Sequence, residues 1–519
     1  MPKLTDFTSY ADAQQHFSNE ALWQLFDGTR ERLNMAHECI DRHVAGDAVA
    51  IRVAHSDGRD EIITFEEISR RSAQFAHHLR GRGVAPGDRV AVMLEPSLPF
   101  YVAMFGAMKA GAVAVPMFTL FGPDGIRLRV QDCEPKVVFT NAEKAPEAQE
   151  AGGAEVVVTD DAFLESLADL PGTFEVDTAG DDLAVLQYTS GTTRALPAAV
   201  KHTHRSIVTL MVAALYATGI RPGDRFFCPS SPAWGHGLWH GTLAPLALGV
   251  STGTFSGKFD PVRLLKALQD FEITNLSAAA THYRMMRNSG EAENFTYSIA
   301  KLSFTGEPLD SETGTYIRRL FGTPVCSMYG TTEIGVILAN YPGAEDFEVR
   351  DGSLGKAVPG VEVQVQDAEG NELPPDEIGE LMVRRRGEWF PTKDLGKTDA
   401  DGYFYHGGRA DDVIISAGWT IGAVEVEDAI LKHPAVAEAA AIGVPDPVRG
   451  QVVKAFIVLK ADETEGLAAE IQDTVRASLA RHEYPRQVAF VDDLPKTPAG
   501  KVNRKALRDA EAKQTENTA

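Results

Sequence analysis

Apolar residues in the first part of the chain recur with two alternating spacings. Residues 89–94 (RVAVML) form a short apolar run, and residues 100–109 carry apolar positions at helical spacing. Residues 113–115 are again apolar, and Pro116 follows them. A strand, a helix and a second strand in this order predict a βαβ unit with parallel strands.

The same rhythm returns between residues 225 and 306, where residues 260–271 are amphipathic and residues 301–304 read as a buried strand. From about residue 352 the pattern changes. Residues 361–365 alternate between apolar and polar, and residues 379–383 form another short strand pattern after a Gly-containing turn. This spacing predicts a small antiparallel β unit.

After Arg409 the pattern changes again. Residues 425–431 and 466–481 have helical spacing, whereas residues 435–444 and 452–459 resemble strands. These segments predict an α+β domain of about a hundred residues, a common domain size. We expect the polar tail from Glu511 to be frayed.

Composition narrows the class of protein. The 519 residues are 44% hydrophobic and 24% charged, and the net charge of −23 argues against a broad basic surface for nucleic acid. The N-terminus is too polar for a signal peptide, and no apolar run approaches the length of a membrane span. Widely spaced cysteines predict buried, reduced thiols and a cytoplasmic protein. They are Cys39, Cys133, Cys228 and Cys326.

The segment YTSGTT (residues 188–193) is the strongest local signal. It follows an apolar run and precedes a helix-like run. Backbone N–H groups and hydroxyls around a glycine can surround a phosphate, because glycine permits close approach. A plain Ser/Thr/Gly loop is the alternative interpretation. The candidate phosphate contacts are Thr189, Ser190, Gly191, Thr192 and Thr193.

This segment resembles the phosphate loop of the adenylate-forming superfamily, which includes acyl-CoA synthetases, peptide-synthetase adenylation domains and luciferases. In that family the loop continues to a lysine; matched to that pattern, this chain carries one extra residue and has Ala198 in place of the lysine. We hypothesise that Arg194 or Lys201 replaces the lysine. The resemblance spans about residues 85 to 505 and implies binding of ATP.

Further motifs follow in the family's order. By resemblance, Gly306, Glu307 and Pro308 flank the adenine. Tyr329, Gly330, Thr331, Thr332 and Glu333 match the next motif, in which the aromatic residue stacks on adenine, the second threonine contacts the α-phosphate and the glutamate holds Mg²⁺. A carboxylate suits this hard cation.

The resemblance also assigns the ribose and the hinge. Asp394 would bind the ribose hydroxyls, Arg409 would contact the ribose and phosphate, and Asp411 would be the hinge between two domains. Many relatives carry an arginine where this chain has Thr420, so that phosphate contact should be missing. Lys501 would enter the active site and bridge the acyl carboxylate and the α-phosphate, where a positive charge stabilises the transition state.

The implied fold is α/β, with a large N-terminal AMP-binding domain at residues 1–410 and a mobile C-terminal α+β domain at residues 411–519. The N-terminal domain should hold two doubly wound sheets and the small β unit.

The acyl pocket indicates which acid is used. Residues 231–237 (SPAWGHG) lack the carboxylate that binds an amino group in amino-acid-activating relatives. Gly330 stands where acetyl-CoA synthetases have a tryptophan, which predicts an acid larger than propionate. Pocket candidates are Trp234, Gly235, His236, Met328 and Gly330, with Trp239 as a neighbour; for His236, Met328 and Trp239, ordinary core packing is an equal alternative.

The chain looks most like the medium-chain acyl-CoA synthetase group. By that comparison the contacts to coenzyme A would come from Ala417, Gly418, Trp419, Arg449 and Arg476. We therefore predict an ATP- and Mg²⁺-dependent ligase that joins a carboxylic acid to coenzyme A through an acyl-adenylate. The alternatives are an enzyme that loads a carrier protein and a catalytically silent nucleotide-binding relative. The acid and the oligomeric state cannot be read from the sequence.

Overall fold

The structure is a computed structural model that describes residues 2–188, 199–331, 334–409, 414–416, 419–446, 450–479, 484–497 and 501–518. For residues 409, 415, 419, 420, 450 and 514–518 it describes the backbone alone. By internal contacts the chain forms two compact units. Unit 1 contains residues 1–305, 317–348 and 358–360, and unit 2 contains residues 306–316, 349–357 and 361–519. The boundary at residue 410 stays a proposal.

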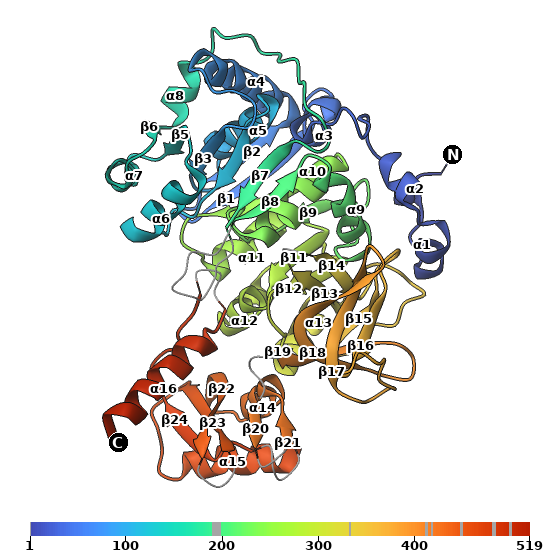
Figure 1. Cartoon of the computed structure of the whole chain (residues 1–519), viewed down its shortest axis with the longest axis vertical. Coiled ribbons are helices and arrows are strands. Elements are labelled where there is room, and N and C mark those ends of the chain that lie inside the picture. The colour runs from blue at the N-terminus through green and yellow to red at the C-terminus, as the bar shows by residue number, and fades with distance from the viewer. Residues whose placement is uncertain are drawn as a thin grey trace. The chain divides into compact units, whose positions relative to one another are not determined.

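The first sheet of unit 1 has helices on both faces (Figure 1). Its strand order is β6-β5-β3-β4-β7-β8, and all neighbouring pairs are parallel except β7 and β8. Side chains of Ala91, Met93 and Val115 pack against helices α6 and α7. Helix α5 packs against β3 and β4, and α4 packs against α5. The elements are β3 (Arg89–Met93), β4 (Val113–Pro116), β5 (Val137–Thr140), β6 (Glu155–Val158), β7 (Leu183–Gln187), β8 (Val200–Thr203), α4 (Phe65–Gly81), α5 (Leu98–Lys109), α6 (Pro123–Cys133) and α7 (Ala145–Ala151).

The second sheet of unit 1 runs β14-β13-β12-β11-β9-β10-β1-β2. Strands β13 to β1 are parallel, and antiparallel strands β14 and β2 flank them. Its elements are β1 (Val49–His55), β2 (Asp60–Thr64), β9 (Arg225–Phe227), β10 (Ser251–Ser256), β11 (Asn275–Ala279), β12 (Lys301–Thr305), β13 (Val325–Thr331), β14 (Gly335–Ala339), α9 (Ser206–Tyr216), α10 (Ala244–Ala247), α11 (Pro261–Asp270) and α12 (Ala280–Asn288).

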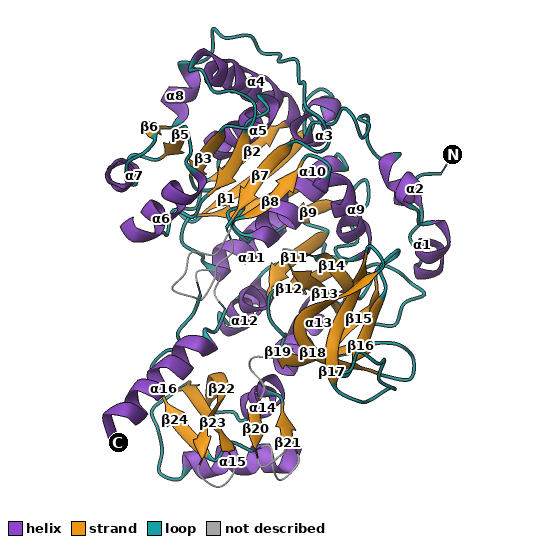
Figure 2. Cartoon of the chain, viewed as in Figure 1, coloured by secondary structure: helices purple, strands orange, loops and turns teal. Residues whose placement is uncertain are grey.

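Unit 2 holds an antiparallel sheet in the order β16-β17-β18-β19-β15. It also holds a smaller sheet, β21-β20-β23-β22, in which β24 pairs with β23 (Figure 2). Helices α14 and α15 cover one face of the smaller sheet, and α16 packs on the other. The elements are β15 (Ser353–Ala357), β16 (Val363–Gln366), β17 (Gly379–Arg385), β18 (Glu388–Thr398), β19 (Phe404–Arg409), β20 (Ile414–Ser416), β21 (Trp419–Ile421), β22 (Val436–Asp446), β23 (Gly450–Leu459), β24 (Gln487–Phe490), α14 (Ala423–Leu431), α15 (Leu467–Ser478) and α16 (Arg504–Thr518).

Most of the elements predicted from the sequence are present in the structure. The βαβ unit at residues 89–116 is confirmed, as are the antiparallel β unit and the α+β segments after Arg409. The expectation of a frayed tail from Glu511 is wrong, because this residue lies in α16 and pairs with Lys454 at 2.7 Å. All four cysteines are buried and free, as predicted. In the described part of the chain, no helix is both long and apolar enough to cross a membrane.

Candidate active site

The predicted phosphate loop lies between two paired strands. Residues 189–198 are outside the described residues, but β7 ends directly before them and β8 begins just after them, with Gln187 paired to Val200. The Tyr188 hydroxyl donates to the Asp132 carboxylate at 2.6 Å. Burial, and then this hydrogen bond, raise the pKa of the Tyr188 hydroxyl, so it stays a donor at neutral pH. The entrance to the loop is thereby fixed to helix α6.

A second contact holds the same strand end. The Trp239 indole N–H donates to Gln187 Oε1 at 2.7 Å, and the His202 ring lies 4.4 Å from the Trp239 ring between centroids. Burial lowers the pKa of His202 to about 4, so its imidazole is neutral near pH 7. Trp239 is 7% exposed. These contacts pack Trp239 against the end of β7 and against β8.

The candidate acyl pocket begins after β9 and leads into a π-helical segment, His236–Leu243. Such segments are rare and recur at functional sites. His236 is buried, with Nδ1 2.9 Å from Ser230 Oγ and Nε2 2.9 Å from Ser277 Oγ. The Trp234 ring meets the His236 ring edge-on at 5.4 Å. Both ring nitrogens of His236 therefore face hydroxyl partners that fix the ring.

Strands β13 and β14 position the adenine motif. Met328 is buried, and Tyr329 and Gly330 lie where the register between the two strands shifts. A Cβ atom on Gly330 would lie 2.0 Å from the carbonyl oxygen of Gly335. Glycine is therefore required here by the close approach of two backbones, and not only by the width of an acyl pocket. Thr331 ends β13; Thr332 and Glu333 lie outside the described residues.

Unit 2 brings together the two predicted ribose contacts. Asp394 on β18 and Arg409 on β19 are directly opposite in the antiparallel register. Asp394 is 5% exposed, and its Oδ1 lies 3.9 Å from Nε2 of His406. Gly306 follows β12 with φ of 101°, which glycine adopts readily. Glu307 and Pro308 continue this turn.

Lys501 lies in a hairpin that we call the Lys501 hairpin; its described arms are residues 495–497 and 501–503. The Thr497 N–H donates to the Lys501 carbonyl at 2.7 Å, and the Asn503 N–H donates to the Pro495 carbonyl at 2.7 Å. Lys496 and Val502 form an isolated antiparallel bridge. The arms therefore have β geometry although the sequence suggested a proline-rich loop.

The predicted coenzyme A contacts are partly described. The Arg476 guanidinium lies 4.0 Å from the centre of the Tyr484 ring, and the Arg486 guanidinium lies 5.1 Å from it. Two cations beside one aromatic ring suit phosphate groups. Trp419 opens β21. The other predicted positions are outside the described residues: Asp411, Ala417, Gly418 and Arg449.

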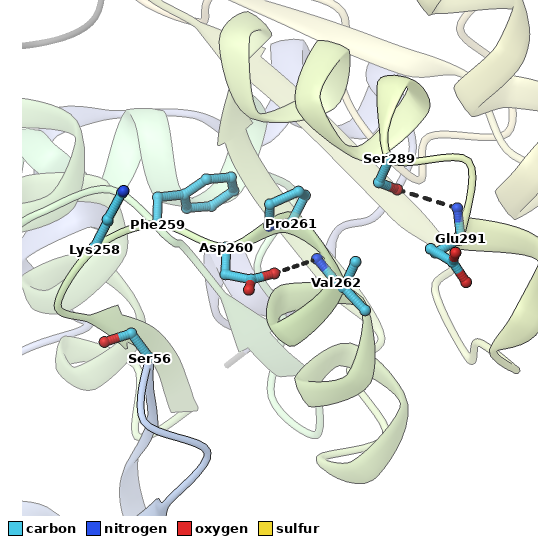
Figure 3. Close-up of a pocket in the computed structure, with 8 residues that line it drawn as sticks. All are labelled: Ser56, Lys258, Phe259, Asp260, Pro261, Val262, Ser289 and Glu291. Atoms are coloured by element: carbon cyan, nitrogen blue, oxygen red, sulfur yellow. Dashed lines mark hydrogen bonds between the residues drawn. The ribbon is translucent and has the colours of Figure 1, made fainter.

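A surface hollow of about 690 Å³ lies elsewhere in unit 1 (Figure 3). It is bounded by residues that follow β1 and β10, by the start of α11 and by the end of α12. Asp260 caps α11 by accepting from the Val262 N–H, and the Glu291 N–H donates to Ser289. Among the residues that the structure describes, no predicted site residue lines it. The lining residues are Ser56, Lys258, Phe259, Asp260, Pro261, Val262, Ser289 and Glu291.

Comparison with known proteins identifies the family. The sequence model described as AMP-binding enzyme matches residues 40–388. The chain belongs to the AMP-binding enzyme family. The model of the AMP-binding enzyme C-terminal domain matches residues 425–501.

This AMP-binding enzyme resembles several acyl-CoA synthetases along nearly its whole length. A *Bacillus subtilis* (strain 168) protein named acetyl-coenzyme A synthetase is 32% identical, with 96% of this chain and 94% of the relative covered. The mitochondrial acyl-coenzyme A synthetase ACSM3 of *Mus musculus* is 30% identical, with 98% and 94% covered. The crystal structure of anthranilate CoA ligase AuaEII in complex with anthranoyl-AMP has a TM-score of 0.86 and 28% identity, with 95% and 99% covered.

Sequence reasoning missed the residues of this AMP-binding enzyme that hold the site residues in place. At the end of β7, before the predicted phosphate loop, Asp132 accepts a hydrogen bond from Tyr188 and Gln187 accepts one from Trp239. Ser230 and Ser277 hold His236. No local motif marks Asp132, Gln187 or Ser277, because their contacts join segments that are distant in sequence. Ser230 lies only 6 residues before His236, next to the predicted pocket segment. A buried polar residue at the end of a strand, such as Gln187, is the one signal that could have been noticed.

Proposed function

We propose that this AMP-binding enzyme is an ATP-dependent carboxylic acid–CoA ligase that releases AMP and pyrophosphate. The observation that carries the proposal is the ordered set of nucleotide motifs together with full-length similarity to acyl-CoA synthetases. The substrates are a carboxylic acid, ATP and coenzyme A. We also propose a cytoplasmic location, because all four cysteines are buried and free, as suits a reducing compartment.

In the first half-reaction the acid's carboxylate attacks the α-phosphorus, and pyrophosphate leaves. Lys501 and Thr332 stabilise the negative charge that develops, and the phosphate loop holds the outgoing groups. Mg²⁺ would neutralise phosphate charge when bound, and Glu333 is its proposed protein ligand. Mg²⁺ is usually held by one or two carboxylates with phosphate oxygens and waters, so a single glutamate fits. Tyr329 would stack on adenine.

In the second half-reaction the thiol of coenzyme A attacks the acyl carbon, the thioester bond forms and AMP leaves. We propose that the C-terminal domain, residues 411–519, turns about Asp411 between the two steps. Arg476 beside Tyr484 would then meet phosphates of coenzyme A, with Ala417, Gly418, Trp419 and Arg449.

The acid is proposed to be larger than propionate and not an amino acid. Residues 231–237 offer no carboxylate to an ammonium group, and Gly330 places no side chain in the pocket. AuaEII, a structural neighbour, was solved with an aromatic acyl-adenylate. The *Bacillus subtilis* relative is named for acetate, so acetate and propionate are the acids whose preference would contradict this proposal.

Pyrophosphate release with a panel of acids tests the activity. The panel contains acetate, propionate, medium-chain, branched, alicyclic and aromatic acids, with and without coenzyme A. Release with no acid in the panel would favour a silent nucleotide-binding relative. Acyl-adenylate formation that yields a thioester with a carrier protein but not with free coenzyme A would favour a carrier-loading enzyme.

The half-reactions test the assigned roles separately. Lys501→Ala should abolish adenylation but still convert a supplied acyl-adenylate into the thioester. Asp411→Pro should do the reverse, because proline restricts the backbone at the proposed hinge. Equal loss of both steps in Lys501→Ala, or normal overall turnover in Asp411→Pro, would contradict the respective role.

A further inference from the structure

A partly buried ion pair follows the Lys501 hairpin along the chain. Arg504, the first residue of α16, donates from Nε to Glu427 Oε1 at 2.9 Å and from Nη2 to Glu427 Oε2 at 2.5 Å. The side chains are 20% and 9% exposed. This is a two-point contact between a planar guanidinium and a carboxylate, which fixes direction as well as distance.

The same carboxylate has a third partner. The Ala441 N–H on β22 donates to Glu427 Oε1 at 2.7 Å. Glu427 comes from α14, so one buried carboxylate joins α14, β22 and the start of α16. Removing it would leave a guanidinium and a backbone N–H in a poorly solvated place without their acceptor.

Arg504 follows Lys501 by three residues, and the arm between them is ordered by further contacts. Asn503 Oδ1 caps α16 by accepting from the Ala506 N–H at 3.1 Å. Val502 packs against the apolar cluster that contains Leu494 and Leu507. The apolar contacts hold the hairpin against the sheet, whereas the ion pair sets the direction in which the chain leaves it.

We propose that Glu427 and Arg504 are a positioning pair for Lys501. The pair fixes the second arm of the Lys501 hairpin, so that the Lys501 ammonium is presented to the acyl carboxylate and α-phosphate during adenylation. The proposal rests on the proposed function, because it takes over the role of Lys501 there. It predicts that substitution of Glu427 or Arg504 slows adenylation and not thioester formation, because both residues act through the position of Lys501.

The decisive variant is Glu427→Gln. An amide can still accept through one oxygen from the Ala441 N–H and from Arg504 Nε. Its NH₂ group would face the donor Nη2, so the second contact of the fork is lost. Displacement of a catalytic group by about 1 Å can lower a rate by about 100-fold, so we expect adenylation to fall by about 10- to 100-fold. Conversion of a supplied acyl-adenylate to the thioester should change little.

Arg504→Gln should give the same pattern, and Arg504→Lys should recover part of the rate because it keeps the charge but not the fork. The double variant Glu427→Gln/Arg504→Gln should lose no more than either single variant, because both remove one interaction. Amide exchange of residues 495–503 should be faster in Glu427→Gln, while that of α15 is unchanged.

The matched control is Glu511→Gln. It breaks the Lys454–Glu511 pair, which also ties α16 to the small sheet and whose side chains are 15% and 16% exposed. This variant should keep the adenylation rate and the exchange rate of residues 495–503. Thermal unfolding of every variant separates loss of fold from loss of position, and Arg504→Lys serves if Glu427→Gln does not fold.

Equal loss of both half-reactions in Glu427→Gln, or an equal loss of adenylation in Glu511→Gln, would overturn the proposal. Lys501→Ala is measured alongside. If Lys501→Ala keeps full adenylation, the proposed role of Lys501 fails and the positioning pair fails with it. If Lys501→Ala loses adenylation while both Glu427→Gln and Arg504→Gln keep it, the positioning pair alone fails.

Discussion

Substitution of Gly330 by alanine tests whether this glycine serves the backbone or the acyl pocket. The added Cβ would lie 2.0 Å from the carbonyl oxygen of Gly335 and 2.7 Å from Cα of Val336. Both obstacles belong to the backbone of β14, which is paired to β13. A flexible side chain could turn away from the new methyl group, but a paired strand cannot.

The expected loss of stability follows from this contact. Overpacking of a well-packed site costs about 1–3 kcal/mol. Each ladder hydrogen bond that is lost when the strands separate adds about 1 kcal/mol. We therefore expect Gly330→Ala to lower the free energy of unfolding by about 2–4 kcal/mol. Adenylation should fall by a similar factor for every acid, since Tyr329 and Thr331 shift together.

The assay is urea unfolding monitored by tryptophan fluorescence. It is combined with measurement of pyrophosphate release for the acid panel. Gly81→Ala is the matched control. Gly81 is the last residue of α4, and a Cβ added to it would meet nothing within 4 Å. We therefore expect Gly81→Ala to leave the free energy of unfolding unchanged or to raise it by up to about 1 kcal/mol. An unchanged unfolding midpoint in Gly330→Ala, with a selective loss of bulky acids, would refute the backbone explanation.

Other predictions concern the phosphate loop and its surroundings. Burial lowers the pKa of His204 to about 4 from its usual 6.5. Between these two values the unfolded chain binds a proton that the folded chain does not. The free energy of unfolding should therefore be highest above pH 6.5 and fall by up to about 3 kcal/mol as the pH drops towards 4. In His204→Asn, the free energy of unfolding measured in urea should depend less on pH between 6.5 and 4. Arg194→Ala and Lys201→Ala measure which cation replaces the lysine: at least one should raise the Michaelis constant for ATP, and unchanged values in both would reject the hypothesis. Trp239→Phe removes the indole N–H that donates to Gln187 Oε1 at the end of β7. The Michaelis constant for ATP should therefore rise while that for coenzyme A stays constant. Equal changes in both constants would contradict the assignment of the loop after β7 to phosphate binding.

The sequence predicted the elements and the order of motifs well because these depend on local patterns. The alternation at residues 361–365 indicates a strand with one buried face. The apolar runs near residues 89 and 113 indicate parallel strands that are covered on both faces. Apart from the phosphate contacts proposed at residues 189–193, the site residues were named from the resemblance. The structure adds that Asp394 and Arg409 stand opposite each other, which no local pattern predicts.

What the sequence could not supply is contact between distant segments. Glu427 reads as an ordinary polar position of an amphipathic helix, yet it binds Arg504 and Ala441. Gly330 reads as a small residue in a pocket, and the structure adds that the close backbone of the next strand also requires a glycine there. The helix at the C-terminus was missed because its polar composition was read as a frayed end, although residues 504–513 are rich in good helix formers. Leu507 and the ion pair of Glu511 anchor this helix to the small sheet.

The antiparallel pairing of β7 with β8 has a consequence for the length of chain that can join them. Gln187 and Val200 are held opposite each other by the ladder, so the chain between them begins and ends at fixed points. Lengthening a closed loop of about a dozen residues by one residue costs about 0.1 kcal/mol of closure entropy. An inserted residue such as the extra one near Ala198 can therefore be absorbed between the strands without a change of register. The loop can accept insertions and deletions during evolution, or in engineering, while the strands around it keep their places.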